Sequence, residues 1–269
     1  MYNKAVGIFD SGLGGLTAVR ALRRLMPEEN IIYFGDTGRM PYGGRPRRQI
    51  REIARQNIEF VESFGVKAIL AACGTISSNA GDILDDNGTK VIGVMQPGVR
   101  ELAETGFAKL GVIATKASIE GGAFRRELEK LRPDAEILTV ACPDFVPMIE
   151  SGHFRADDPV VKETVERTLA PLRDAGTQAL LLGCTHYGII SGAIENCLGG
   201  TVLIGAADAA ARAMQGYLTE NGMTAGNGGE SYFTSGSTED FERLAPIMLG
   251  YPLKSGVGYI EPFSLEETK

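Results

Sequence analysis

Short apolar runs alternate with longer segments of helical period along almost the whole chain. The runs are rich in β-branched residues and lack the polar alternation of a half-exposed sheet, which is typical of parallel strands buried on both faces. We expect strands at residues 5–9, 31–34, 68–72, 91–95, 110–114, 136–141, 179–182 and 201–204. Apolar residues at helical spacing predict helices at residues 17–25, 48–63, 117–131 and 159–174. The alternation therefore predicts an α/β fold with open parallel sheets and helices on both faces.

The chain also contains an internal repeat. Each half opens with a strand that contains Gly7 or Gly111 and leads into a helix. Later in each half another apolar strand ends at a cysteine, Cys73 or Cys184, which lies 66 or 73 residues after that glycine. Because ligands of open α/β sheets bind beyond the carboxyl ends of the strands, we predict two pseudo-symmetric α/β domains with the active site in the cleft between them. The predicted boundaries are residues 1–95 together with 207–269 for the first domain, and 96–206 for the second.

The composition is that of a soluble globular enzyme. Of the 269 residues, 43% are hydrophobic and 23% are charged, which is too apolar for a disordered chain. The formal net charge of −7 argues against a nucleic-acid partner. One group of arginines shares a helical pattern with Glu52 and Glu59, which favours a solvated helix face over a nucleic-acid patch. These arginines are Arg45, Arg47, Arg48, Arg51 and Arg55.

The sequence also bears on where the protein works. It contains no apolar stretch long enough for a membrane span, and its first residues lack the apolar core of a signal peptide. The four cysteines include no C-x-x-C pair and do not resemble a disulfide framework. We therefore expect a cytoplasmic protein with reduced thiols and without a membrane partner.

Two cysteines at matching strand ends are suited to proton transfer at a carbon atom. Racemisation needs a base that removes a proton from one face of the carbon and an acid that returns a proton to the other face. A thiol titrates at about 8.5, and a helix N-terminus or a nearby cation lowers this pKa toward neutrality. Because a helix is predicted after each cysteine, we expect lowered thiol pKa values. A single buried cysteine is more often a packing residue, but the matching positions of Cys73 and Cys184 favour a functional pair.

Other kinds of site fit the sequence less well. A zinc site built from these two cysteines and His186 lacks the clustered spacing of metal ligands, so no metal is predicted. Cys142 and Cys197 have no counterpart in the repeat and are interpreted as packing residues. The glycine-rich turn from Asp10 to Gly15 is neither a P-loop nor a dinucleotide motif, and we predict that its amides bind a carboxylate.

Several motifs carry a resemblance to a known family. They are the segment from Ile8 to Thr17 (IFDSGLGGLT), the segment from Tyr33 to Thr37 followed by Pro41-Tyr42-Gly43, Ala72-Cys73 with Thr75, the segment from Gly183 to Tyr187 (GCTHY) and, more weakly, Glu150 with Gly152. In this order they resemble the motifs of glutamate racemases, in the aspartate/glutamate racemase superfamily. The resemblance covers essentially the whole chain.

The resemblance implies an amino-acid racemase that uses no cofactor. Cys73 and Cys184 would be its acid/base pair, with Asp10 assisting the first thiol and Glu150 and His186 assisting the second. The implied substrate-binding residues are Ser11, Pro41, Tyr42, Gly43, Gly74, Thr75 and Thr185. The implied substrate is glutamate, and the D-glutamate formed would supply bacterial peptidoglycan. A homodimer is one assembly that the resemblance allows.

The chain departs from the family pattern beside the first thiol. Gly74 stands where the family usually has Asn, and Gly205-Ala206 stands where it has Asp-Ser or Asp-Pro. Loss of the Asn amide removes substrate hydrogen bonds worth about 0.5–1.5 kcal/mol each. We therefore expect Gly74→Asn to raise the efficiency on glutamate, unless Gly74 makes room for another substrate or a neighbouring group already fills the space.

Two alternative functions follow from these observations. The first is a racemase of another amino acid, such as aspartate, because Gly74 changes the substrate frame. The Pro41-Tyr42-Gly43 loop favours glutamate over that alternative. The second is a non-catalytic two-lobed binding protein, in which the paired thiols would have no purpose.

Overall fold

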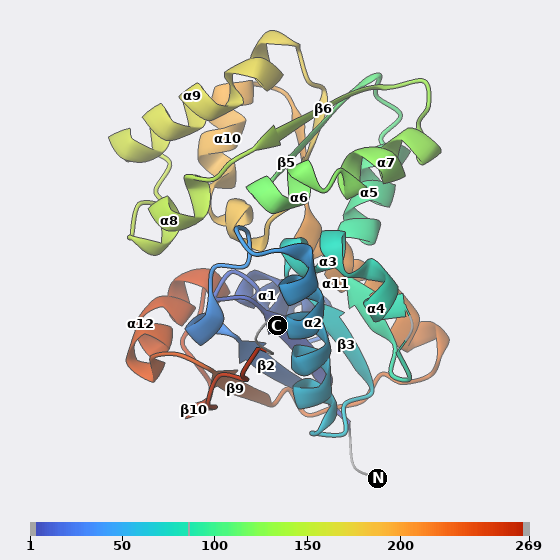
Figure 1. The fold of residues 1–269 in the computed structure, drawn as a ribbon, viewed down its shortest axis with the longest axis vertical. Helices are drawn as coiled ribbons and strands as arrows, with labels where there is room; N and C mark the ends of the chain where they lie inside the picture. The colour runs from blue at the N-terminus through green and yellow to red at the C-terminus, as the bar shows by residue number, and fades with distance from the viewer. Residues whose placement is uncertain (1–3, 86, 266–269) are drawn as a thin grey trace.

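A computed structural model describes residues 4–85 and 87–265 of the chain. It contains two parallel sheets, each flanked by helices, in two halves that meet along a shared boundary (Figure 1). The chain passes from the first half to the second between β4 and α5 and returns through β8 and α11. The prediction of two open parallel-sheet α/β units is confirmed.

The two sheets share one strand order. The strands are β1 (Val6–Asp10), β2 (Ile31–Gly35), β3 (Ala68–Ala71), β4 (Val91–Gly93), β5 (Lys109–Ala114), β6 (Glu136–Ala141), β7 (Ala179–Leu182), β8 (Val202–Gly205), β9 (Glu230–Thr234) and β10 (Val257–Tyr259). The order is β10-β9-β2-β1-β3-β4 in the first sheet and β6-β5-β7-β8 in the second, with every neighbouring pair parallel. The order β2-β1-β3-β4 is thus repeated as β6-β5-β7-β8, as the internal repeat predicts.

Helices connect the strands and cover both faces of each sheet (Figure 1). They are α1 (Leu16–Leu25), α2 (Arg47–Glu62), α3 (Gly74–Asn79), α4 (Gly81–Asp85), α5 (Met95–Glu104), α6 (Lys116–Glu120), α7 (Ala123–Leu131), α8 (Phe145–Glu150), α9 (Pro159–Asp174), α10 (Ser191–Leu198), α11 (Ala206–Glu220) and α12 (Thr238–Leu249), with the 3₁₀ helices η1 (Thr37–Arg39) and η2 (Thr185–Ile190). The amphipathic pattern of α1 explains its position, because Leu16, Val19 and Leu22 are fully buried on one side. The helix ends two residues before Pro27.

One predicted helix needs correction, and two strands are missing from the prediction. The helix predicted at residues 117–131 is two helices, α6 and α7, because Gly122 adopts a φ of +67° between them, a conformation that favours glycine. The sequence patterns do not predict the strands β9 and β10. Their runs are short and carry polar residues such as Glu230, whose buried carboxylate is paired with Arg23.

The repeat places both cysteines at equivalent points. The strands β3 and β7 each lie beside the central strand of their sheet, β1 and β5 respectively. Cys73 follows two residues after Ala71, and Cys184 follows two residues after Leu182. Both thiols therefore lie just beyond the carboxyl ends of inner strands, where the sequence analysis expects the site.

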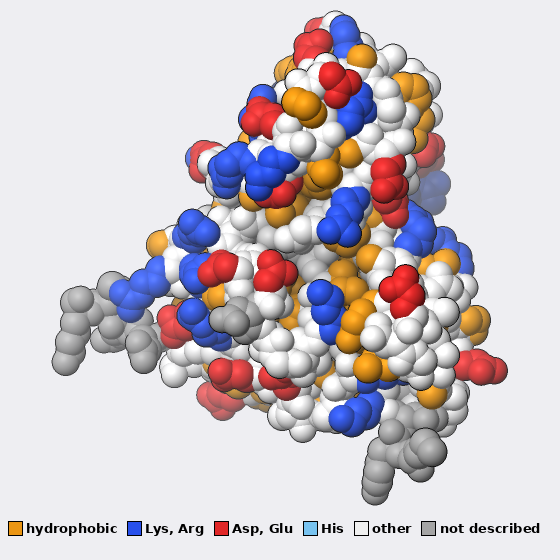
Figure 2. Space-filling model, turned by 90° about the vertical axis from the view of Figure 1, so that its right-hand side faces the viewer, with side chains coloured by type: hydrophobic (Ala, Val, Ile, Leu, Met, Phe, Trp, Pro, Cys, Tyr) orange, Lys and Arg blue, Asp and Glu red, His pale blue; other side chains and the backbone are white. Residues whose placement is uncertain are grey.

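Other global predictions concern charge, membranes and domain boundaries. On the face shown in Figure 2, Lys and Arg side chains are interspersed with Asp and Glu side chains. Within the arginine group, Arg51 Nη2 donates a hydrogen bond to Asp82 Oδ2 at 2.7 Å, so this arginine is paired with a carboxylate. Among the described residues, no helix is long and apolar enough to cross a bilayer. The proposed domain boundaries stay a prediction, and the parts of the first domain assigned to residues 1–3, 86 and 266–269 lie outside the described residues.

Candidate active site

A cavity of about 480 Å³ lies between the two halves. Its lining residues are Asp10, Ser11, Met40, Pro41, Tyr42, Gly43, Gly44, Cys73, Gly74, Thr75, Thr115, Lys116, Cys142, Pro143, Val146, Pro147, Glu150, Cys184, Thr185 and His186. All the site residues named from the sequence are among them. The cavity thus brings together side chains that are far apart in the chain, while the role of each residue stays a prediction.

Cys73 lies on the side of the cavity formed by the first half. The residue is 3% exposed, and its Sγ donates to Ser11 Oγ at 3.7 Å. Burial raises the pKa of this thiol, and the negative charge of Asp10 raises it further. The prediction that the following helix lowers the pKa is therefore wrong for Cys73, because α3 has only six residues and does not offset desolvation.

Asp10 organises the glycine-rich turn that follows β1. Its carboxylate accepts a hydrogen bond from the backbone N–H of Gly15 at 2.5 Å and another from the N–H of Ser11 at 2.8 Å. Thr185 of the second half donates to the same carboxylate at 3.4 Å. The prediction that the amides of this turn bind an external carboxylate is therefore wrong for these two amides, because Asp10 already occupies them.

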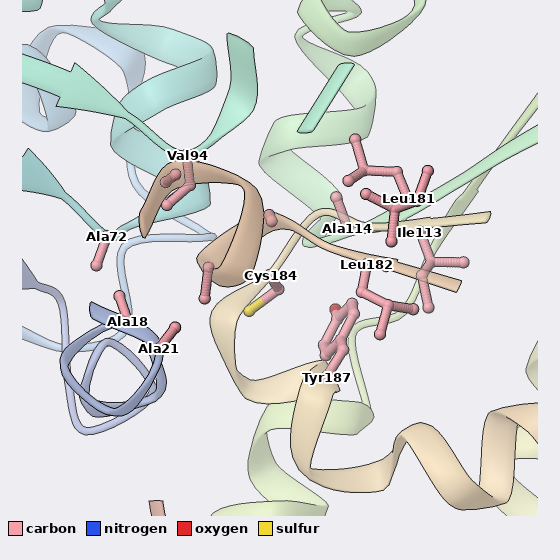
Figure 3. Packing of buried hydrophobic residues seen from close by; sticks show 14 of the residues in the cluster. Ala18, Ala21, Ala72, Val94, Ile113, Ala114, Leu181, Leu182, Cys184 and Tyr187 are labelled. Carbon is pink, nitrogen blue, oxygen red and sulfur yellow. The ribbon is translucent and has the colours of Figure 1, made fainter. Parts of the chain in front are cut away.

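Cys184 lies on the opposite side of the cavity, formed by the second half. In Figure 3 it lies between Ala18 and Ala21 of α1 and the side chains of Leu182 and Tyr187, and all five residues belong to one buried cluster. Cys184 is 8% exposed, so its sulfur is largely screened from bulk water.

A chain of polar contacts leads from Cys184 to Glu150. Cys184 Sγ is 3.8 Å from His186 Nδ1, and His186 Nε2 is 3.1 Å from Glu150 Oε1. Burial opposes protonation of the imidazole, but its contacts with Cys184 and Glu150 outweigh burial and raise the pKa of His186 to about 10. At neutral pH the second thiol therefore faces an imidazolium ion.

The loop that follows η1 forms another wall of the cavity. Pro41 and Gly43 line the cavity, whereas the Tyr42 side chain is 1% exposed and its hydroxyl donates to the carboxylate of Asp36. Tyr42 therefore anchors the loop, and the peptide groups beside it face the cavity. On the far side, Thr75 and Thr115 join the two halves through a hydroxyl contact of 3.1 Å.

Gly74 lies where the backbones of the two thiol-bearing strand ends approach each other. A Cβ atom at this position would lie far inside van der Waals contact of the Gly183 carbonyl oxygen, next to Cys184. Similarly, a Cβ atom at Gly14 would overlap the His186 ring. These glycines allow the halves to pack directly against each other. The expectation that Gly74→Asn restores a substrate contact conflicts with this geometry. The geometry corresponds instead to the alternative in which a neighbouring group, here the Gly183 carbonyl, already fills the space that the Asn side chain would need.

Several lining residues are not identified by the sequence analysis. Thr115 occupies the place in the repeat that Ser11 occupies in the first half, so the repeat itself carries the signal for it. Cys142, interpreted from the sequence as a packing residue, is 1% exposed and also borders the cavity. Lys116 at α6 has no signal in the sequence. An apolar wall comes from Met40, Pro143, Val146 and Pro147.

The cavity is equipped for proton transfer between two thiols. Within residues 4–85 and 87–265, no group of three or more His, Cys, Asp and Glu side chains could hold a metal ion. All four cysteines are free in the described structure. A thiol with a raised pKa and a thiol facing an imidazolium ion approach the cavity from opposite halves. This arrangement suits removal of a proton by one thiol and its replacement by the other.

Known proteins are similar to this chain in both sequence and fold. Residues 17–214 match the family model described as Asp/Glu/Hydantoin racemase. A glutamate racemase from Thermus thermophilus is 41% identical over 243 residues, which are 89% of this chain and 90% of the relative. The solved structure of a Francisella tularensis glutamate racemase in complex with D-glutamate has a TM-score of 0.90 at 33% identity, covering 97% of this chain and 99% of that chain. The structure of a T. thermophilus glutamate racemase in complex with β-chloro-D-alanine has a TM-score of 0.86 at 38% identity, covering 96% and 97% of the two chains.

Proposed function

The chain belongs to the Asp/Glu/hydantoin racemase family, and we propose that it interconverts L- and D-glutamate by proton transfer between Cys73 and Cys184. The observation that carries the mechanism is the position of the two thiols. Each lies at an equivalent strand end of its half, and both line one cavity. The relatives support glutamate as the substrate, because those that match most of this chain at 33–41% identity are glutamate racemases.

Each turnover moves one proton off the α-carbon and one proton onto it. In one direction the Cys184 thiolate removes the proton from one face of the α-carbon, and the electron pair of the C–H bond passes into the adjacent carboxylate. The Cys73 thiol then delivers its proton to the opposite face and becomes a thiolate. The reverse direction begins from that state, with Cys73 as the base and Cys184 as the acid. Two groups of the same kind therefore support both directions.

The neighbours of the thiols control their protonation states. His186, held by Glu150, stabilises the Cys184 thiolate by charge and by a hydrogen bond. Burial keeps the proton on Cys73 until it is delivered. Asp10 stands beside the first thiol, and its charge favours an ammonium group nearby. The amino group of the substrate is therefore assigned to this side of the cavity.

The carboxylates of glutamate need hydrogen-bond donors. The Ser11 hydroxyl, the peptide groups at Tyr42 and Gly43, and the hydroxyls of Thr75 and Thr185 surround the cavity and can supply them. Gly74 provides no side chain, so its contribution is its own N–H. Lys116 adds a positive charge at the cavity wall. Aspartate, with a shorter side chain, is the less favoured substrate, and a binding role without catalysis leaves the two thiols unexplained.

The compartment and the use of the product follow from the free cysteines of the protein and from the chemistry of D-glutamate. We place the protein in the cytoplasm, because four free cysteines suit a reducing compartment. D-glutamate formed there would supply peptidoglycan synthesis. Assembly as a homodimer stays a prediction, which the molar mass in solution by light scattering would check.

The proposed function is tested by circular dichroism of the purified protein with single enantiomers. We expect L-glutamate and D-glutamate each to reach the racemic mixture, with L-aspartate changing far more slowly. Protein dialysed against a chelator and free of pyridoxal phosphate should retain full activity. Rapid turnover of another amino acid without turnover of glutamate would overturn the substrate assignment. Activity that returns only on addition of pyridoxal phosphate or a divalent metal ion would overturn the two-thiol mechanism.

A further inference from the structure

The last described segment of the chain, residues 260–265, lies against the base of the loop that borders the cavity. It follows β10 and is fixed to β9 by a hydrogen bond from the Ile260 N–H to the Thr234 carbonyl at 2.8 Å. Phe263 then packs its ring against Phe34 and Phe60, with centroid distances of 6.4 Å and 5.9 Å. The same ring faces the guanidinium of Arg39, whose carbon is 5.4 Å from the ring centroid. This segment lies outside the family match at residues 17–214.

Arg39 connects this segment to the loop. Its Nε donates to the carboxylate of Asp36 at 2.7 Å, and its Nη2 donates to Asn57 at 2.9 Å. The same Asp36 carboxylate accepts the hydroxyl of Tyr42, which is the anchor of the loop. Ser235, at the end of β9, donates to the other oxygen of Asp36 at 2.6 Å. One buried carboxylate thus joins the loop, Arg39 and the C-terminal part of the first sheet.

The cluster around Asp36 is deeply buried. Asp36 and Asn57 are fully buried, and the exposed fractions of Tyr42 and Arg39 are 1% and 6%. A buried guanidinium is costly unless all its donors are used and its surface is covered. Phe263 meets both needs, because its carbonyl accepts from Arg39 Nη1 at 3.3 Å and its ring covers the guanidinium.

A second contact fixes the same position. The Gln56 side-chain amide donates to the Ser264 carbonyl at 3.0 Å, and its oxygen accepts from Arg39. The backbone at two successive residues of the segment therefore holds Arg39, once directly and once through Gln56. Removing these contacts would leave Arg39 open to water on one side. The anchor of Tyr42 would then weaken, because Arg39 and Tyr42 share the carboxylate of Asp36.

We propose that residues 260–265 act as a strap that positions the substrate loop, with Phe263 as a positioning residue that works through Arg39, Asp36 and Tyr42. The strap does not contact the cavity, since none of its residues lines it. This proposal depends on the proposed function only in assuming that the loop binds glutamate. The strap acts on substrate binding and leaves the two thiols unchanged, so its loss should raise KM while kcat stays near the wild-type value.

The test compares Phe263→Ala with Phe64→Ala. Phe64 belongs to the same aromatic group, with its ring centroid 5.2 Å from Phe60 and 4.8 Å from Phe233, and it is 40% exposed. Both variants lose a phenyl ring, but only the first uncovers Arg39. We expect Phe263→Ala to raise the KM for glutamate about five- to twentyfold, with kcat within about twofold of wild type. Phe64→Ala should leave KM unchanged.

Hydrogen exchange of the backbone amides provides a readout that does not depend on racemisation. In Phe263→Ala the amides of residues 37–45 should exchange faster than in wild type, whereas in Phe64→Ala they should not. Phe263→Leu, which keeps bulk but not the ring, should lie between the wild type and Phe263→Ala. Equal rises in KM for the two alanine variants, or unchanged exchange in Phe263→Ala, would overturn the strap. A wild type without activity on glutamate would overturn the proposed function, while the exchange comparison would still decide on the strap.

Discussion

The two strand ends that carry the thiols are equivalent in topology and different in chemistry. Cys73 lies beside Ser11 and the carboxylate of Asp10, and its pKa is raised. Cys184 lies beside His186, which Glu150 holds and whose own pKa is raised to about 10. The repeat places a thiol on each side of the cavity, and the local side chains place an anion beside Cys73 and a cation beside Cys184.

The different surroundings of the two thiols meet a requirement of the reaction, which needs one thiol protonated and the other deprotonated before each turnover. Two identical thiols in identical surroundings would have no reason to hold one proton between them in a defined place. The burial of the Cys73 thiol and the anion beside it favour the protonated form of Cys73. The same halves also differ in support. The first has β9, β10 and the strap behind its substrate loop, and the second sheet ends at β6.

The largest effect is expected from removing either thiol. Cys73→Ala and Cys184→Ala should each lower racemisation by at least about a thousandfold, because each removes the acid/base group proposed for one face of the substrate. Each should cost about 1 kcal/mol of stability, since a small buried side chain is lost. Circular dichroism of glutamate and thermal melts check both parts. Near-normal turnover in both directions by either variant would exclude the two-thiol mechanism.

Replacing the cation beside Cys184 should have the next largest effect. His186→Asn should lower kcat/KM by about ten- to a hundredfold, because the Cys184 thiolate loses its charged partner. The fall in kcat/KM must be the same in both directions, since the two enantiomers have equal free energy in water. The kcat values should fall unequally, because only one direction begins with Cys184 as the base. His153→Asn is the control, as His153 lies outside the cavity and pairs with Asp158.

A side chain at Gly74 should separate the two strand ends. Gly74→Asn places a Cβ against the Gly183 carbonyl, so we expect about a tenfold loss in efficiency on glutamate and a loss of about 1–3 kcal/mol in stability. Gly216→Asn is the matched control, because a Cβ at that position of α11 meets no neighbour within 4 Å. A gain in glutamate efficiency for Gly74→Asn would show that the halves open readily, and a gain on another amino acid would change the substrate assignment.

A further effect concerns the dependence of stability on pH. The pKa of His186 is about 10 in the folded protein and about 6.5 when unfolded, so its contribution to stability is complete below pH 6.5 and is lost as pH rises toward 10. The free energy of unfolding, measured by urea titration, should therefore fall between about pH 6.5 and 10. His186→Asn should flatten this slope. An equal slope in His186→Asn would contradict the charged state of the imidazole.

The sequence predicts the fold and the two thiols because both depend on local patterns, whereas most of the other site residues are predicted only by the family resemblance. Apolar runs and helical spacing define the strands of the repeat, and the repeat in turn locates Cys73 and Cys184. These patterns could not predict β9, whose buried Glu230 depends on a distant partner, Arg23. The end of α6 before Gly122 could not be predicted, because a glycine also occurs within continuous helices and its positive φ is not visible in the sequence.

The electrostatic details of the site could not be predicted in the same way. The pKa of Cys73 depends on how deeply the thiol is buried and on the position of Asp10, which only the packed structure defines. The contact at Gly74 joins residues from the two halves, so the chain order gives no sign of it. The strap likewise depends on a contact between Arg39 and Phe263, which are far apart in sequence.

The transfer of protons between two thiols on opposite faces is tested most directly in heavy water. Wild-type protein is mixed with L-glutamate in deuterium oxide, the enantiomers are separated at early times, and their deuterium content at the α-carbon is measured by mass spectrometry. We expect deuterium in the D-glutamate formed and almost none in the remaining L-glutamate, with the converse from D-glutamate. Deuterium that entered the recovered substrate as fast as the product would mean that one group serves both faces, and would contradict the two-thiol mechanism.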